Sequence, residues 1–234
     1  MTGPSSNSGV EWVVRSVLSR LLAFLLGLIL SATLMAALEL GAEWIAAIEN
    51  RHGAEAGERM RAWQSMMESS QDLSDGAKLQ AVNDFFNRLR FVDDSALWGV
   101  SDYWATPFEF LVKNGGDCED FAIAKYFSLI HVGVDEERLR LTYVKALDYD
   151  QAHMVLTYFA TPRATPLVLD NLDPHILPAT ERTDLQPVYS FNGTGLWLAK
   201  AAGSGKRVGG SERLDLWRDL QSRMQSMAPD TPKP

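Results

Sequence analysis

The chain has 234 residues, of which 46% are hydrophobic and 22% charged, and its formal net charge is −8. This length suits one domain with appendages, and the apolar share is sufficient for a packed core. The negative balance excludes nucleic acid as the main partner, because phosphate binding requires clustered Lys and Arg. The only cysteine is Cys118, so an intramolecular disulfide is excluded and stability must come from packing.

The N-terminal stretch indicates export. Arg15 and Arg20 precede an apolar run at residues 21–38 that carries no charge. Basic residues before such a run are typical of a signal peptide or a membrane helix. The run is long for a signal core and just long enough to span a bilayer, so cleavage and retention as an anchor both stay open. In both cases residues 1–38 direct the remainder across a membrane, and the alternative to both is a buried helix of the globular domain.

Two apolar stripes at helical spacing predict helices at residues 54–70 and 76–90. The residues expected to face the core are Met60, Trp63 and Met67 in the first helix and Leu79, Val82, Phe86 and Leu89 in the second. A third, short helix follows. Thr106, Pro107 and Glu109 form the pattern of a capping box with proline at the first helical position.

The segment GGDCEDFAIAKYFS, residues 115–128, places Cys118 in the first turn of an apolar-periodic helix. Unpaired backbone N–H groups and the helix dipole at that position lower the pKa of a thiol and stabilise the thiolate. A buried, inert cysteine is the alternative, but Asp117, Glu119 and Asp120 around it argue against an apolar setting. The same carboxylates would raise the pKa of the thiol, which opposes the effect of the helix.

After this helix the apolar period changes to two, which predicts successive strands. Their short connections favour antiparallel pairing, so the chain is of the α+β class with the cysteine helix packed on a sheet. We assign residues 39–205 to this domain and 206–234 to a C-terminal helix and tail. The predicted strands are 139–147, 153–159, 166–172, 187–191 and 195–200, and they are followed by a Gly-rich loop at 203–210 and a helix at 211–227.

His153 opens one predicted strand and Asp170 lies near the end of the next. Adjacent strands can bring the two side chains together, and the helix packed on the sheet can bring Cys118 to the imidazole. The three would form a nucleophile, a general base and acid, and an orienting carboxylate. Singly, a strand-end histidine and a turn aspartate are more often structural, but together with the cysteine they favour a triad. The weaker histidine candidates are His52, His131 and His175.

The motifs GGDCEDFAIAKYF, AHMVL and LVLDNL, in this order, resemble the bacterial transglutaminase-like cysteine proteinases. The segments DYWATPFEFL and PVYSFN, with GLWL after it, extend the resemblance to the LapG-type periplasmic proteases over about residues 75–200. The resemblance implies a papain-like or transglutaminase-like core. It also implies Cys118 as nucleophile, with its backbone N–H as an oxyanion donor, His153 as base and acid, and Asp170 as the orienting carboxylate.

The resemblance further implies a calcium site made by Asp117 and Glu119, with Asp120 as a third ligand. Calcium takes about six to eight oxygen ligands, so backbone carbonyls or waters must contribute, and the loop at residues 148–150 is a possible source. A bound cation would also remove the repulsion between the carboxylates and the thiolate. The alternative is that these acids only stabilise the N-terminus of the helix.

The function implied by the resemblance is that of an exported, calcium-dependent cysteine endopeptidase in the periplasm. Its substrate would be the N-terminal region of a large surface adhesin, cut at an Ala-Ala type site to release the adhesin and disperse a biofilm. Its regulator would be an inner-membrane cyclic di-GMP receptor resembling LapD. Two alternatives stay open. One is an amide or acyl transferase with the same triad, and the other is a catalytically silent binding module.

Overall fold

A computed structural model describes residues 41–198 and 205–227. The predicted export segment therefore lies outside the described residues, and in the part of the chain that is described no helix is long and apolar enough to cross a membrane. Residues 40–223 form the first of two compact units. The predicted domain boundaries stay a prediction.

Three helices open the first unit: α2 (Ala42–His52), α3 (Ala54–Ser70) and α4 (Asp75–Phe86). The predicted core stripe of α3 is buried throughout, and that of α4 is buried as far as Phe86. The prediction that the second helix continues to residue 90 is wrong. The chain leaves the helix after Phe86 because β1 (Arg90–Phe91) pairs in parallel with β2 (Gly115–Gly116).

The short helix α6 (Pro107–Lys113) begins at the predicted capping box. Thr106 Oγ1 accepts the N–H of Glu109 at 3.2 Å, and the Glu109 carboxylate accepts the N–H of Thr106 at 2.7 Å. The helix ends at Asn114, whose φ of 55° lies in the left-handed region. The chain then passes through β2 directly into α7 (Cys118–His131), so that α6 fixes the approach to the cysteine. The remaining helix between β1 and α6 is α5 (Asp94–Leu97).

The strands form one antiparallel sheet in the order β6-β5-β4-β3-β7-β8-β9. All five predicted strands are present as β3, β4, β5, β7 and β8. The strand β6 was not expected, and the predicted loop at 203–210 is wrong over residues 206–209, which pair with β8 as β9. The bounds are β3 Leu139–Ala146, β4 Gln151–Tyr158, β5 Leu167–Leu169, β6 Leu177–Pro178, β7 Leu185–Phe191, β8 Leu196–Leu198 and β9 Lys206–Gly209.

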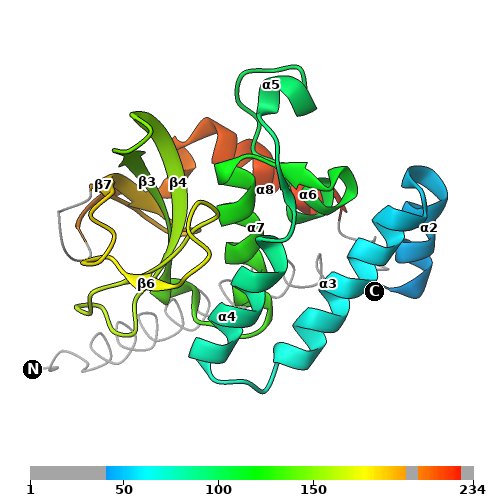
Figure 1. Cartoon of the computed structure of the whole chain (residues 1–234), viewed down its shortest axis with the longest axis horizontal. Coiled ribbons are helices and arrows are strands. Elements are labelled where there is room, and N and C mark those ends of the chain that lie inside the picture. Colours follow the sequence, from blue (N-terminus) through cyan, green and yellow to red (C-terminus); the bar gives the residue numbers. More distant parts are fainter. Residues whose placement is uncertain (1–40, 199–204, 228–234) are drawn as a thin grey trace, which may run out of the picture. The chain divides into compact units, whose positions relative to one another are not determined.

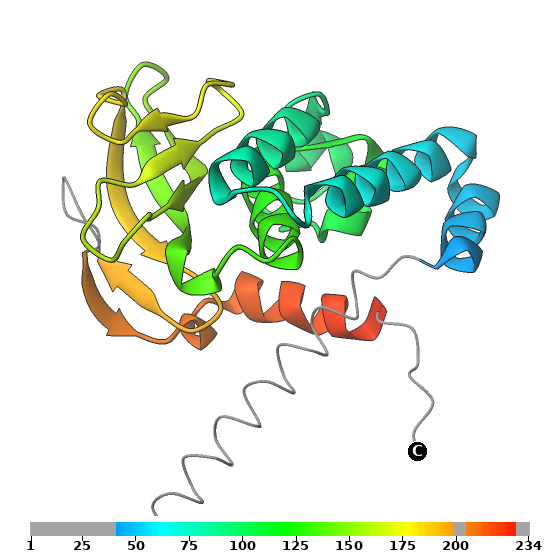
Figure 2. The same cartoon turned by 90° about the horizontal axis from the view of Figure 1, so that it is seen from below.

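Helix α7 lies between the sheet and the helices α3, α4 and α6, as Figures 1 and 2 show. Its side chains from Phe121 to Leu129 are all buried. Trp63 of α3 donates its indole N–H to Ser128 Oγ at 2.9 Å and packs edge-on against Phe108 of α6. The predicted C-terminal helix is α8 (Asp215–Met227), which begins only after a 3-10 turn, and its Trp217 is fully buried. These contacts hold α7 in place along its whole length.

The Trp63–Ser128 hydrogen bond predicts a measurable coupling between α3 and α7. Trp63→Phe leaves the buried Ser128 hydroxyl without this donor, so the free energy of unfolding should fall by about 1–3 kcal/mol, as measured by urea unfolding. Adding Ser128→Ala should recover part of the loss, because neither partner is then left unpaired. A double variant that loses the sum of the two single effects would show that the bond contributes nothing.

Candidate active site

Cys118 is the first residue of α7 and is only 9% exposed. The buried carboxylate of Asp120 fixes the turn around it, because its two oxygens accept the N–H of Ala105 at 2.7 Å and the N–H of Asp117 at 3.3 Å. Gly116 is required here, since a Cβ at this position would lie 2.1 Å from Asp120 Oδ2. The Trp-Ala-Thr-Pro segment and the cysteine turn are therefore tied together by one side chain.

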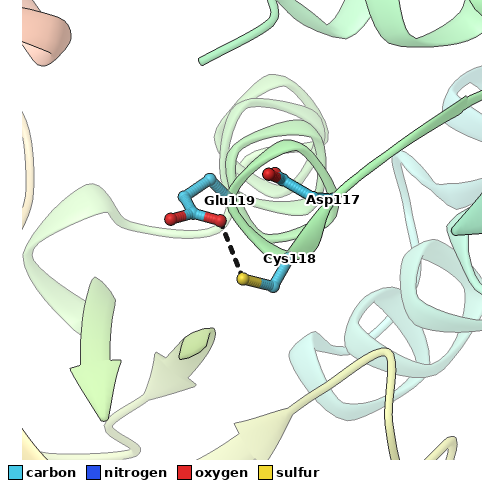
Figure 3. Close-up of side chains that lie close together, drawn as sticks. All are labelled: Asp117, Cys118 and Glu119. Carbon is cyan, nitrogen blue, oxygen red and sulfur yellow. Dashed lines mark hydrogen bonds between the residues drawn. The ribbon is translucent and has the colours of Figure 1, made fainter. Parts of the chain in front are cut away.

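The thiol of Cys118 points toward the carboxylate of the next residue, as Figure 3 shows, and donates to Glu119 Oε2 at 2.7 Å. Burial raises the pKa of Cys118, and the negative charges of Glu119 and Asp117 raise it further, whereas the backbone N–H of Met154 lowers it. The expectation of a pKa lowered by the helix N-terminus is thus wrong for this arrangement. Burial and the flanking carboxylates, which the sequence also showed, outweigh the helix.

His153 and Asp170 lie side by side, as predicted from their strands. His153 is the third residue of β4, Asp170 directly follows β5, and His153 Nε2 is 2.7 Å from Asp170 Oδ1. Both side chains are buried, at 2% and 0% exposed. Burial alone would raise the pKa of Asp170, but the hydrogen bond and charge of His153, with the hydrogen bonds of the Leu172 N–H and of Arg182, lower it to about 2. The carboxylate is therefore ionised and able to stabilise an imidazolium.

The thiol lies near the end of β4 that carries the histidine, because the backbone N–H of Met154, the neighbour of His153, is close enough to lower the pKa of Cys118. Since Nε2 of His153 is engaged with Asp170, Nδ1 is the ring nitrogen left to exchange a proton with the thiol. Among the described residues no hydrogen bond joins Cys118 to His153, because the thiol donates to Glu119 instead. Release of that contact is needed before the thiol can reach the imidazole.

The other three histidines lie elsewhere. His52 and His131 end α2 and α7, and His175 lies in the loop before β6, where its Nδ1 is 2.8 Å from Asp173. His175 is exposed and pairs only with this local carboxylate. These positions agree with the expectation that the three are weaker candidates for the catalytic histidine.

Two overlapping groups of side chains place their ligand atoms within 4.8 Å of one another: Asp117 with Cys118 and Glu119, and Asp94 with Asp117 and Asp120. Asp94, from α5, was not expected from the sequence, because only the fold brings it to the cysteine turn. One oxygen of Asp94 and one of Asp117 are buried without a hydrogen-bond partner. Burial and the charges of Glu119, Asp120 and Asp94 raise the pKa of Asp117 to about 9. Clustered carboxylate oxygens of this kind fit a hard divalent cation.

The loop at residues 148–150 does not join this cluster. Asp148 and Asp150 belong to neither group, and Asp150 forms an exposed ion pair with Lys145 at 2.5 Å. The prediction that this loop helps to complete the calcium shell concerns backbone carbonyls or waters, and it stays a prediction. Of the predicted acidic ligands, Asp120 already has both oxygens occupied by backbone N–H groups, whereas Asp94 has a free one.

A cysteine at a helix N-terminus, beside a strand that carries a buried histidine–aspartate pair, is the arrangement of thiol-dependent acyl-transfer enzymes. The chain belongs to the bacterial transglutaminase-like cysteine proteinases, whose family model matches residues 50–191. No protein with a curated functional description matches the chain.

Solved structures of one relative support the same assignment. Legionella pneumophila LapG is 43% identical over 77% of this chain and 97% of its own, with a TM-score of 0.67. A structure described as calcium-bound LapG of that organism is 44% identical over 79% of this chain and 99% of its own, with a TM-score of 0.68. An EGTA-treated form of it is also known, with a TM-score of 0.68. The chain is a cysteine proteinase of the LapG type.

The contact between Cys118 and Glu119 predicts how the thiol reacts. In EGTA, Glu119→Gln should speed alkylation of Cys118 by iodoacetamide at neutral pH, because loss of the neighbouring negative charge lowers the pKa of the thiol. The measurement is the alkylation rate as a function of pH by mass spectrometry. The exposed Glu137→Gln is the control and should behave as wild type. An unchanged pH dependence in Glu119→Gln would mean that burial and the charge of Asp117 raise the pKa of Cys118 without a contribution from Glu119.

Proposed function

We propose that this chain is a calcium-dependent cysteine endopeptidase in which Cys118, His153 and Asp170 form the catalytic triad. The observation that carries the proposal is the buried His153–Asp170 pair at the end of β4 where the thiol lies. No other described histidine combines burial with a buried carboxylate partner. The pair provides a base of fixed orientation, which a cysteine with a raised pKa requires.

In this mechanism Nδ1 of His153 accepts the proton of the Cys118 thiol, and the thiolate attacks the carbonyl carbon of the scissile amide. Asp170 stabilises the imidazolium that forms. The backbone N–H of Cys118, at the unpaired N-terminus of α7, stabilises the oxyanion. His153 then passes its proton to the leaving amine, which leaves a thioester. Water adds to the thioester and restores the thiol.

Calcium is proposed from the acidic cluster and from the relative whose structure is described as calcium-bound. Asp117 and Glu119 would hold the ion, with Asp120 or Asp94 as the third carboxylate. The free oxygen of Asp94 favours it over Asp120, whose oxygens serve the turn. When bound, the ion supplies positive charge beside the thiol. A Glu119 carboxylate engaged as a ligand no longer competes with His153 for the thiol proton.

The substrate, location and regulator are proposed by resemblance to the LapG-type proteases. The substrate is the N-terminal region of a large surface adhesin, cut at an Ala-Ala type site, and its release disperses the biofilm. The regulator is an inner-membrane cyclic di-GMP receptor that sequesters the protease. A periplasmic location is supported by the apolar run at residues 21–38 with its preceding arginines.

A calcium site at the cysteine turn predicts a pH-dependent stabilisation that needs no substrate. Because the folded-state pKa of Asp117 is raised to about 9, the folded state in EGTA holds protons that the unfolded chain has lost. Stability in EGTA should therefore fall as the pH rises from about 4 to about 9. Calcium should oppose this fall, raising stability by about 2.7 kcal/mol at a hundredfold excess over its Kd.

The measurement is the thermal midpoint with calcium or EGTA at several pH values. Asp117→Asn should flatten the pH dependence in EGTA and remove most of the calcium effect, and Asp148→Asn, in the loop outside the cluster, is the matched control. If calcium leaves the midpoint unchanged at every pH, the acids serve only the helix N-terminus.

The proposed activity is tested by incubating the full chain with an N-terminal adhesin fragment that contains an Ala-Ala sequence, followed by mass spectrometry. We expect two fragments that meet at this site, and we expect them to be lost in EGTA and in Cys118→Ala. An adduct with an added amine, in place of hydrolysis, would favour the transferase. Absence of fragments with an alkylatable Cys118 would contradict the adhesin as substrate.

A further inference from the structure

The carboxylate of Asp170 is held by a side chain outside the proposed triad. Arg182, in the connection between β6 and β7, donates from Nη2 to Asp170 Oδ2 at 2.7 Å. The other oxygen, Oδ1, contacts His153 Nε2 at 2.7 Å and accepts the N–H groups of Asn171 and Leu172 at 2.7 and 3.1 Å. The two oxygens are thus divided between the histidine and the arginine.

Arg182 is itself fixed and buried, at 5% exposed. Its Nε and Nη2 contact the two oxygens of Asp184 at 2.9 and 2.7 Å. The backbone of Asp184 is anchored to the end of β3, because its carbonyl accepts the N–H of Leu147 at 2.8 Å. The guanidinium therefore lies between two carboxylates, and Asp184 holds it beside Asp170.

Two further side chains contact Asp170, but only at its backbone. Lys125 Nζ of α7 and Asn87 Nδ2 donate to the Asp170 carbonyl at 3.0 and 2.9 Å. Among the described residues, Arg182 is the one side chain besides His153 that hydrogen-bonds to the carboxylate itself. Arg182 differs from Lys125 and Asn87 because it bonds to the same charged carboxylate as His153, whereas they bond only to the backbone carbonyl.

The charged groups around His153 have opposing effects on its proton. Asp170 on the β5 side favours the imidazolium, and Arg182 behind it disfavours the imidazolium. From α7, the carboxylate of Glu119, which holds the neutral Cys118 thiol, contributes negative charge. Lys125 contacts Asp170 and contributes positive charge when protonated. The cross-strand neighbour on β3 is Val144, which carries no charge. Arg182 is the strongest cation in this set because its guanidinium bonds to the same carboxylate as the imidazole.

We propose that Arg182 is a positioning residue of the histidine–aspartate pair, which holds the second oxygen of the Asp170 carboxylate and thereby sets how strongly that carboxylate retains the proton on His153. The inference rests on the proposed triad. Without Arg182, the buried carboxylate would be uncompensated and would hold the imidazolium too strongly, so that its proton would reach the leaving amine less readily. Its effect is exerted through Asp170 and involves no contact with the substrate.

The experiment follows His153 directly by NMR in the full chain labelled with ¹⁵N-histidine, and its signals are assigned by their absence in His153→Ala. Arg182→Met should raise the pKa of His153 by about one unit, because a cation near the imidazole is lost. Arg182→Lys, which keeps the charge, should return it toward the wild-type value. If His153 does not titrate within the accessible range, its two ¹⁵N shifts at neutral pH report the same change in protonation.

Two further variants separate this effect from a loss of structure. Arg138→Met removes another networked arginine, bonded to Asp75 and to the carbonyls of Phe159 and Ala160, and should leave His153 unchanged. Asp184→Asn removes a partly exposed carboxylate that competes for the guanidinium, and should lower the pKa of His153 by about half a unit. This second variant carries the test if Arg182→Met does not fold.

The proposal is overturned if folded Arg182→Met and Asp184→Asn both leave His153 unchanged, or if Arg182→Lys shifts it as much as Arg182→Met does. None of these measurements requires a substrate. A wrong adhesin assignment would therefore leave the result intact, whereas a failure of the proposed triad would appear as activity that survives His153→Ala.

Discussion

The site depends on one buried carboxylate, that of Asp120 in the first turn of α7, and on this helix. Its two oxygens bind the backbone of the cysteine turn and of the segment before α6, so the first turn of α7 cannot move without breaking both. Helix α7 is in turn enclosed by the sheet and by the helices α3, α4 and α6, as Figure 2 shows. The nucleophile therefore occupies a fixed point, and the strands β4 and β5 bring the histidine and the aspartate to it as a preformed pair.

Opposing electrostatic effects act on the Cys118 thiol. The helix N-terminus favours a thiolate, but the burial of Cys118 and the acids beside it disfavour one. The same acids are what a hard cation requires, and two of their oxygens lack a partner. The arrangement thus links two functions in one turn. The carboxylates that would bind the ion are the ones that raise the pKa of the thiol. Binding of an ion would therefore also remove the charge that opposes the thiolate.

The sequence predicted what is local or periodic. The helical stripe of α3, the capping box at Thr106 and the alternation of the five strands each follow from nearby residues, and so does the pairing of His153 with Asp170 on consecutive strands. The sequence did not predict features that depend on contacts between distant segments. Arg182 and Asp94 reach the site through the fold, with no motif around them, and β9 is a strand because β8 lies beside it. The second predicted helix ends early because residues 90–91 pair with the glycines before Cys118.

The hydrogen bond between Cys118 and Glu119 joins chain neighbours, so it requires little ordering of the chain. Its consequence extends to redox chemistry. Oxidation of cysteine to sulfenic acid begins from an exposed thiolate, and this thiol is buried, protonated and held by an acceptor. The chain also has no second cysteine with which a disulfide could form. The hydrogen bond that keeps the thiol from reacting therefore also protects it from oxidation.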